Sequence, residues 1–145
     1  MKYKTETSAG GIVYKKENGK ILWLITQHSQ NKGWSFPKGL IGDTKQNEPM
    51  EEAALREVGE EGGIKAKIVN PQPVETKYKY RFQDTLVDKT VNYFLMEYIS
   101  GDPADHDWEV SEALFLTEEE VKKTLTFKAD QEAFKKILKQ FKSKN

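Results

Sequence analysis

The interpretation of this chain starts from residues 34–64, which read WSFPKGLIGDTKQNEPMEEAALREVGEEGGI. Pro49 suits the first turn of a helix, and residues 50–58 are mostly helix-forming types. The glycine pair at 62–63 then provides a stop, since glycine is the common residue just past a helix end. We therefore expect one helix that begins near residue 50 and ends at this pair.

The expected helix carries two distinct faces. Apolar residues at helical spacing form a stripe for packing, which consists of Met50, Ala54 and Val58 with Leu55 beside it. Glu57, Glu60 and Glu61 stand at i, i+3 and i+4, so their carboxylates share another face. Like charges on one face repel each other unless a cation is held there, and a hard divalent ion such as Mg²⁺ or Mn²⁺ prefers oxygen ligands. An acidic face alone is commonly just solvated, so the wider pattern has to decide.

The wider pattern resembles the signature of the Nudix family, G-x5-E-x7-R-E-U-x-E-E-x-G-U, in which U is an aliphatic residue. When the arginine of the signature is aligned with Arg56, its first glutamate falls on Glu48 and its first glycine on Gly42, and every specified position is matched. In many family members the first glycine ends a Pro-Lys-Gly run, and here that residue is Gly39. The resemblance leaves Gly39 and Gly42 as alternatives for this structural glycine.

The resemblance implies an α/β fold, namely a Nudix-type α/β/α sandwich with a mixed β-sheet. We expect residues 1–145 to form a single Nudix hydrolase domain, because this length suits one core and the sequence has no internal repeat or low-complexity linker. Local patterns predict the other elements, which are a hairpin of residues 12–14 and 21–25 around a turn at 17–19, strands at 34–36, 64–69, 89–99 and 114–116, an alternating aromatic and basic segment at 76–82, a turn at 83–88, a helix start at 117–120 and a closing helix at 130–141. This order is compatible with the sandwich.

Composition argues against several classes of protein. Lysine plus arginine and aspartate plus glutamate both total 23, so no net charge favours DNA or a membrane surface. The chain has no cysteine, which excludes disulfides and thiolate metal sites. No apolar run approaches membrane-spanning length, and the first residues lack the apolar core of a signal peptide. We therefore expect a cytoplasmic protein with no DNA and no membrane as partner.

Nudix enzymes hydrolyse a nucleoside diphosphate linked to a further group, so the resemblance implies a metal-dependent hydrolase. It assigns Glu57, Glu60 and Glu61 as ligands of Mg²⁺ or Mn²⁺. By analogy, the carbonyl of Gly39 is a further ligand. Among the catalytic residues, Arg56 is expected to anchor the helix and orient a glutamate rather than to touch the substrate.

The signature does not fix the catalytic base. Some family members use a glutamate of the signature, and others use a glutamate on a later loop, for which Glu109 is the candidate here. An ordinary loop acid would fit the same position. Lys38 lies where a cation could hold a phosphate, and Glu48 is expected to be structural.

Beyond the signature, the chain is similar to bacterial asymmetrical diadenosine tetraphosphate hydrolases. The similar segments are residues 8–11, 34–39, 89–96, 108–110 and 125–128. In that subfamily a lysine and a tyrosine on one strand contact the phosphates, and they correspond to Lys89 and Tyr93. Aromatic residues also stack on the base, for which the candidates are Tyr80, Phe82 and Phe127. An ordinary position in the core or on the surface is the alternative for each of these aromatic residues.

The resemblance therefore implies hydrolysis of diadenosine tetraphosphate to ATP and AMP, with Mg²⁺ (or Mn²⁺) as cofactor and a small-molecule nucleotide as partner. The alternatives apply the same chemistry to ADP-ribose, an oxidised nucleoside triphosphate, an RNA 5′ end or a diphosphoinositol phosphate. The segment at 76–82 makes RNA conceivable without selecting it. A module that binds a nucleotide without turnover is a further alternative, which the complete set of glutamates disfavours. We expect a monomer rather than a homodimer.

Overall fold

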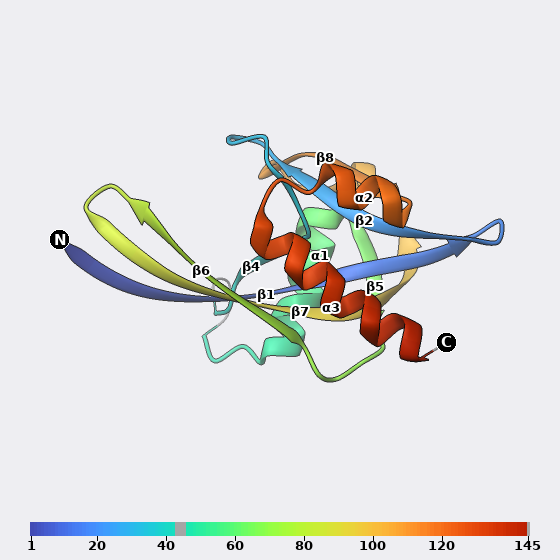
Figure 1. Ribbon diagram of the computed structural model, residues 1–145, viewed down its shortest axis with the longest axis horizontal. Coiled ribbons are helices and arrows are strands. Elements are labelled where there is room, and N and C mark those ends of the chain that lie inside the picture. The colour runs from blue at the N-terminus through green and yellow to red at the C-terminus, as the bar shows by residue number, and fades with distance from the viewer. Residues whose placement is uncertain (43–45, 145) are drawn as a thin grey trace.

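The computed structural model describes residues 1–42 and 46–144, and Figure 1 shows the order of its elements. The strands are β1 (Lys2–Glu17), β2 (Lys20–His28), β3 (Trp34–Ser35), β4 (Lys38–Leu40), β5 (Ile64–Ile68), β6 (Val74–Phe82), β7 (Thr85–Gly101) and β8 (Val110–Leu116). The helices are α1 (Met50–Gly62), α2 (Glu118–Thr124) and α3 (Lys128–Lys144), with a 3₁₀ turn, η1, at Pro103–Asp105. None of the helices in this described part is long and apolar enough to cross a membrane.

One mixed β-sheet connects these strands. Its central path runs β3-β2-β1-β7-β5, while β4 pairs with β1, β6 with β7 and β8 with β2. Strands β1 and β7 run parallel, from Lys2 opposite Thr85 to Tyr14 opposite Glu97. The other pairs are antiparallel. The predicted α/β fold with a mixed sheet is therefore confirmed.

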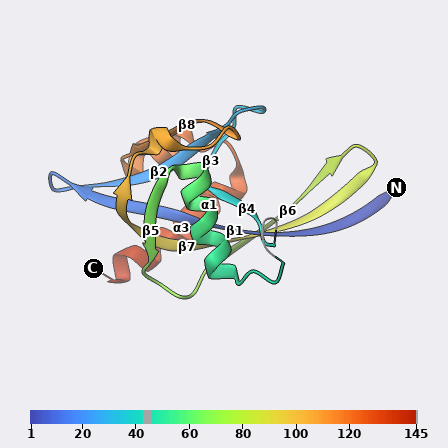
Figure 2. The same ribbon diagram turned by 180° about the vertical axis from the view of Figure 1, so that it is seen from behind.

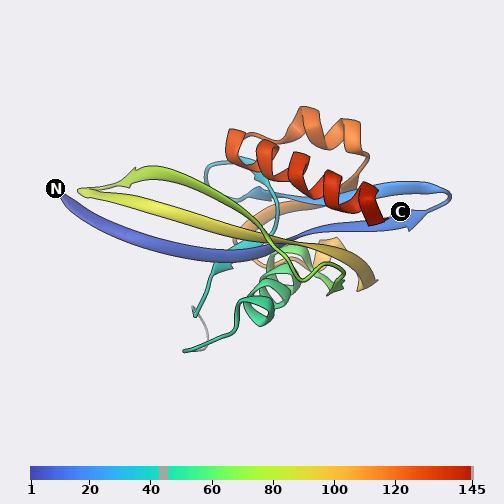
Figure 3. The same cartoon turned by 60° about the horizontal axis from the view of Figure 1, so that its bottom comes forward.

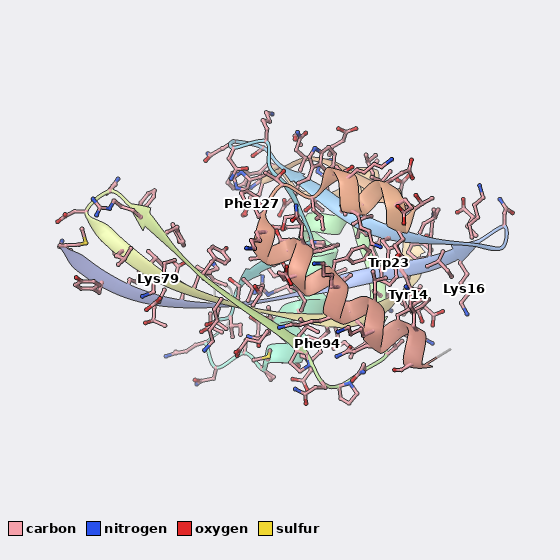
Figure 4. All side chains as sticks on the ribbon, in the orientation of Figure 1. Tyr14, Lys16, Trp23, Lys79, Phe94 and Phe127 are labelled. Carbon is pink, nitrogen blue, oxygen red and sulfur yellow. The ribbon has the colours of Figure 1, made fainter. Side chains whose placement is uncertain are left out.

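Helices cover both faces of the sheet, as Figure 3 shows. On one face, α1 buries Ala54 and Val58 against side chains of β1, β2 and β7. On the other face, Phe134 of α3 packs against Trp23 of β2, with ring centroids 5.3 Å apart. Figure 4 labels Trp23 and Tyr14 in this second core, beneath α3. The two cores produce the α/β/α sandwich that the sequence predicts.

The helix expected from the signature forms, with one difference in its packing face. It runs from Met50 to Gly62, and Gly63 closes it in the left-handed conformation with φ 73°. Leu55, expected beside the apolar stripe, is 38% exposed, whereas Ala53, which was not placed in the stripe, is fully buried. Ala53 therefore adds to the packing face, and Leu55 stays outside the buried cluster.

Three strand segments extend beyond the sandwich and form an arm, on the left of Figure 1 and on the right of Figure 2. The arm consists of residues 2–7 of β1, 76–82 of β6 and 85–90 of β7, which pair side by side. The prediction of a turn over residues 83–88 is wrong, because only Gln83 and Asp84 turn and β7 begins at Thr85. Pairing with both β1 and β6 keeps the first residues of β7 extended.

A hairpin turn and a helix cap form where the sequence predicts them. The hairpin between β1 and β2 turns at Asn18 and Gly19, whose φ values of 53° and 77° suit a tight two-residue hairpin loop. At the start of α2, the Thr117 side chain accepts a hydrogen bond from the N–H of Glu120, and the Glu120 carboxylate accepts one from the N–H of Thr117. This reciprocal cap satisfies backbone donors that the first turn of a helix leaves unpaired.

Candidate active site

One arginine fixes the loop before α1 to the helix. Arg56 donates to the Glu48 carboxylate at 2.8 Å, to Glu57 at 3.0 Å and to Glu60 at 3.1 Å. Glu48 is only 8% exposed, so this pairing neutralises a buried carboxylate. The hydrogen bond to Glu48 is the main cause that raises the pKa of Arg56 above its ordinary value. Arg56 therefore holds the loop, the helix and two glutamates together.

Gly39, in β4, and Gly42, in the loop that follows, meet different structural requirements. Gly39 lies so close to Glu57 that a Cβ at residue 39 would collide with the carboxylate. Gly42 has φ 81°, in the left-handed region that favours glycine, and its N–H donates to Glu48 at 3.3 Å. Each alternative for the structural glycine thus meets a separate requirement, one for space and one for backbone conformation.

Four carboxylates gather where α1 meets the loop before β8, and they belong to Glu57, Glu60, Glu61 and Glu109. Burial raises the pKa of Glu57 to about 7, and the charges of Glu60 and Glu109 act in the same direction. Burial also raises the pKa of Glu61 to about 7, again with a contribution from Glu109. Desolvated carboxylates that repel each other in this way are stabilised by a bound cation.

The oxygen donors are of the kind that the predicted Mg²⁺ or Mn²⁺ prefers, but their arrangement is not yet that of a ligand cluster. Among residues 1–42 and 46–144, no three acidic or histidine side chains form a ready ligand cluster. Glu57 and Glu60 share the Arg56 guanidinium, and Glu61 accepts a hydrogen bond from the N–H of Lys38 at 3.1 Å. Metal binding would require these carboxylates to exchange such contacts for the ion.

The carboxylates form one end of a cleft of about 840 Å³. Most residues that the sequence predicts for the site line this cleft, namely Lys38, Gly39, Glu57, Glu60, Glu61, Tyr80, Phe82, Lys89, Glu109 and Phe127. Figure 4 shows Phe127 at the end of α3 nearest the arm, on which Lys79 is labelled. Of the predicted site residues, Arg56 and Tyr93 do not line the cleft.

Several lining residues were not predicted from the sequence, and they include His28, Asn31, Ser35, Tyr78, Lys128 and Asp130. Asp130 is 5% exposed and accepts hydrogen bonds from the Ser35 hydroxyl at 2.7 Å and from the Tyr93 hydroxyl at 2.8 Å. The Ser35 oxygen in turn accepts a hydrogen bond from Lys38 Nζ at 2.9 Å. A buried carboxylate on α3 thereby holds the ammonium group that faces the glutamates of α1.

Lys89 and Tyr93 lie on the same side of β7, as their even spacing predicts, but in different surroundings. Lys89 lines the cleft, and its ammonium group lies 3.4 Å from the Glu6 carboxylate. Tyr93 is fully buried against Phe36, with ring centroids 5.6 Å apart. Tyr93 therefore meets the cleft through Asp130, and its direct contact with a phosphate stays a prediction.

The loop that carries Glu109 is tied to the end of α1. The Asp107 N–H donates to the Glu60 carbonyl at 2.8 Å, and the Asp107 carboxylate accepts from the N–H of Glu109 at 3.1 Å. The Glu109 carbonyl accepts from the N–H of Ser29 at 3.0 Å. These contacts place Glu109 at the same end of the cleft as the signature glutamates, while its role as a base stays a prediction.

Aromatic side chains of the arm line another part of the cleft. Tyr78 and Tyr80 follow each other along β6 with ring centroids 6.2 Å apart, and Phe82 continues the row. Phe82 is 62% exposed and Phe127 is 44% exposed, so both rings have surface available to a ligand. A planar nucleobase is the kind of group that such rings stack on.

Known proteins share this fold and this signature. A family profile for the NUDIX domain matches residues 4–139, and the chain therefore belongs to the Nudix family. It is 32% identical over 133 residues to a protein named putative mutator protein MutT4 of Mycobacterium tuberculosis. This alignment covers 88% of this chain and 52% of that protein. It is 31% identical over 103 residues to an RNA pyrophosphohydrolase of Teredinibacter turnerae, which covers 65% of this chain and 58% of that protein. The chain thus spans little more than half the length of these relatives.

A solved structure shares the architecture over nearly the whole chain. The binary complex of a C. elegans Ap4A hydrolase superposes with a TM-score of 0.76 at 23% identity, and the match covers 97% of this chain and 99% of that chain. At this identity the likeness shows the fold alone. Together with the family match, it confirms the predicted Nudix membership and sandwich.

Proposed function

We propose that the protein is a divalent-metal-dependent hydrolase of nucleoside polyphosphate anhydrides, with diadenosine tetraphosphate as the substrate that it splits into ATP and AMP. One observation carries the proposal. A single cleft combines acidic side chains for a metal ion, two lysines for phosphates and exposed aromatic rings for a base. Few ligands other than a nucleotide with several phosphates need all three kinds of group.

The order of these groups fits such a substrate. The charge of Lys38 opposes the rise in the pKa of Glu61 that burial causes. Burial lowers the pKa of Lys89, and the charge of Lys38 lowers it further. The Lys38 charge therefore acts on both Glu61 and Lys89, and all three residues line the same cleft. Polyphosphate would extend from the carboxylates past both lysines, which leaves the base beside the aromatic row of the arm.

In this proposal Glu57, Glu60, Glu61 and the carbonyl of Gly39 hold the metal ion. When bound, the ion supplies neutralisation of phosphate charge and a more acidic water. The protein's own contribution is to keep those oxygens close together at the end of the cleft, through Arg56 and the loop that it anchors.

The hydrolytic step forms one bond and breaks another. The oxygen of a water molecule bonds to phosphorus, the bridging P–O bond breaks, and the leaving phosphate oxygen keeps the electron pair. Glu109 is proposed to accept the proton of the attacking water, because it lines the cleft beside Glu57 and Glu61 and its charge affects both of them. Lys38 and Lys89 stabilise the negative charge on the phosphates as the bridge breaks.

A substrate panel in the presence of Mg²⁺, with products separated by chromatography, tests the proposal. We expect ATP and AMP in equal amounts from diadenosine tetraphosphate. Glu60→Gln and Glu61→Gln should each lower kcat by about a hundredfold or more, since each removes a ligand that stabilises transition-state charge. Glu52→Gln, an exposed change on the same helix outside the cleft, is the matched control and should keep the wild-type rate.

Near-normal rates in Glu60→Gln or Glu61→Gln, with folding intact, would refute the metal assignment. Binding of the dinucleotide without any product would support a sensing module instead of an enzyme. Turnover of ADP-ribose, an oxidised nucleoside triphosphate or a diphosphoinositol phosphate in preference to the dinucleotide would keep the hydrolase and change the substrate.

An RNA 5′ end is the second candidate substrate, and the arm is the observation that favours it. The aromatic row of Tyr78, Tyr80 and Phe82 extends outward from the cleft, and it offers room for more bases than one nucleoside needs. The relative from Teredinibacter turnerae is named an RNA pyrophosphohydrolase. A 5′-triphosphorylated oligonucleotide in the same panel separates the two substrates.

A further inference from the structure

The arm carries an acidic residue, Glu6, in contact with a lysine that lines the cleft. Glu6 lies opposite Lys89 in the pairing of β1 with β7, and its side chain is only 12% exposed. Its carboxylate accepts a hydrogen bond from the Tyr80 hydroxyl at 2.7 Å. The ammonium groups of Lys89 and Lys4 lie 3.4 Å and 3.3 Å from it. One carboxylate therefore contacts a lysine and a tyrosine of the cleft wall, Lys89 and Tyr80, and also Lys4, which is not among the lining residues.

Glu6 is held in its ionised form by these partners. Burial acts to raise the pKa of Glu6, but the Tyr80 hydrogen bond and the charges of Lys89 and Lys4 outweigh burial and lower the pKa. A negative charge thus stands between Lys89 and Lys4 near neutral pH. Lys38 and Lys89 line the cleft, whereas Lys4 is not among its lining residues, so Glu6 lies between the second of these lysines and a further cation outside the lining.

We propose that Glu6 is a specificity-determining residue that limits how many phosphates the cleft accepts. The inference rests on the proposed function, in that it takes the ligand to be a nucleoside polyphosphate. Glu6 contacts both Lys89 and Lys4, but of these two lysines only Lys89 lines the cleft, so Lys38 and Lys89 are the cations directed at phosphate and Lys4 lies beyond the Glu6 carboxylate. A phosphate group placed next to Lys4 would also lie next to the Glu6 carboxylate, and like charges at such a distance repel.

The same contacts give Glu6 a positioning effect on the aromatic wall. Its hydrogen bond draws the Tyr80 hydroxyl across β7, because Tyr80 stands opposite Val87 and Glu6 stands opposite Lys89 in the strand pairing. The end of the phosphate site and the start of the aromatic row are therefore set by one side chain. A ligand with a longer phosphate chain would have to break this arrangement.

Titration calorimetry with inorganic tripolyphosphate and with linear hexaphosphate, in the presence of Mg²⁺, tests the proposal without requiring turnover. We expect the wild type to bind hexaphosphate little better than tripolyphosphate. Glu6→Gln keeps an acceptor for Tyr80 and removes the charge, so it should improve binding of hexaphosphate about tenfold and binding of tripolyphosphate less than about threefold. Thermal melting of each variant verifies that the fold is retained.

Two further variants make the test specific. Asp88→Asn removes one negative charge from the adjacent residue of the arm, where Asp88 is exposed and pairs with Lys79, so it should shift both affinities equally and by less than about twofold. Lys4→Met added to Glu6→Gln should cancel the gain for hexaphosphate, because the gain depends on the released Lys4.

The role of Glu6 would be overturned if Glu6→Gln changed the affinities for both polyphosphates equally. It would also be overturned if the gain in affinity for hexaphosphate remained after Lys4→Met was added. Failure of the proposed function is a separate outcome. If the protein hydrolyses no nucleotide but Glu6→Gln still extends the accepted length, the inference stands and the hydrolase proposal falls. If neither polyphosphate binds to the wild type or to Glu6→Gln, the role of Glu6 is overturned, while the substrate panel alone decides the hydrolase proposal.

Discussion

At the scale of single residues, Arg56 organises the site from outside the cleft. Its partners Glu48 and Glu57 have side chains that are only 4% and 6% exposed. Loss of the guanidinium leaves these carboxylates buried without a counter-charge, so we expect Arg56→Met to lower the free energy of unfolding by about 3 kcal/mol. Urea denaturation followed by tryptophan fluorescence measures the change.

Lys67→Met is the control for this prediction. Lys67 pairs with Glu97 on the surface, where both side chains are substantially exposed, and its loss should cost less than about 1 kcal/mol. Equal stabilities for the wild type and Arg56→Met would contradict the view that Arg56 neutralises the buried acids.

Sequence reasoning found the glutamates of α1 because their spacing is local, and it missed Asp130 because that residue's partners are remote. In the sequence Asp130 looks like an ordinary acid in the first turn of a helix, where a negative charge is favourable in any protein. Its bonds to Ser35 and Tyr93 join three distant parts of the chain. Only the packing of α3 against the sheet brings them together.

At the scale of elements, we assign recognition of the base to the arm and the chemistry to α1. Phe82 lies near its tip on the side that lines the cleft and is 62% exposed. If this ring stacks on a base, Phe82→Ala should raise KM about tenfold and leave kcat nearly unchanged, since stacking contributes about 1–3 kcal/mol per base. Steady-state kinetics with diadenosine tetraphosphate measure both constants.

Tyr3→Ala supplies the comparison for the arm. Tyr3 is 76% exposed on the same arm but does not line the cleft, so its removal should change neither constant. A fall in kcat with an unchanged KM in Phe82→Ala would show that the arm acts on the chemical step, contrary to our assignment.

The arm also shows where long-range pairing completes a local pattern. Residues 2–7 place Tyr3, Thr5 and Thr7 on one side and charged residues on the other, which is a short strand pattern, although we did not predict a strand there. They form a strand by parallel pairing with residues 85–90, more than eighty positions away in the sequence. The predicted length of the turn, residues 83–88, was too great for the same reason. Pairing with β1 and β6 decides where β7 begins, and it leaves only Gln83 and Asp84 in the turn.

At the scale of the whole molecule, the cleft depends on both layers of the sandwich, because α1 supplies the carboxylates and α3 supplies Asp130. The resemblance to the Nudix family implied these layers, and the alternation and helical spacing in the sequence predicted elements compatible with them. They did not predict that the two layers meet at one end of the sheet to form the site. The contacts that join the layers there are remote in sequence, such as the hydrogen bond from Ser35 of β3 to Asp130 of α3.

Trp23 tests how strongly the two layers are coupled. It is 1% exposed and packs against Tyr14, Phe134 and Phe141, with ring centroids 5.2–5.7 Å away. Trp23→Ala leaves a cavity beneath α3, so we expect a loss of about 3–5 kcal/mol and a fall in Tm of about 10 °C or more. Trp108→Ala is the control, because Trp108 is 79% exposed and its removal should change stability by less than about 0.5 kcal/mol.

If the sandwich unfolds as one unit, activity and far-UV circular dichroism will be lost at the same temperature in Trp23→Ala. Loss of activity well below the melting of secondary structure would mean instead that α3 separates from the sheet on its own and takes Asp130 out of the cleft.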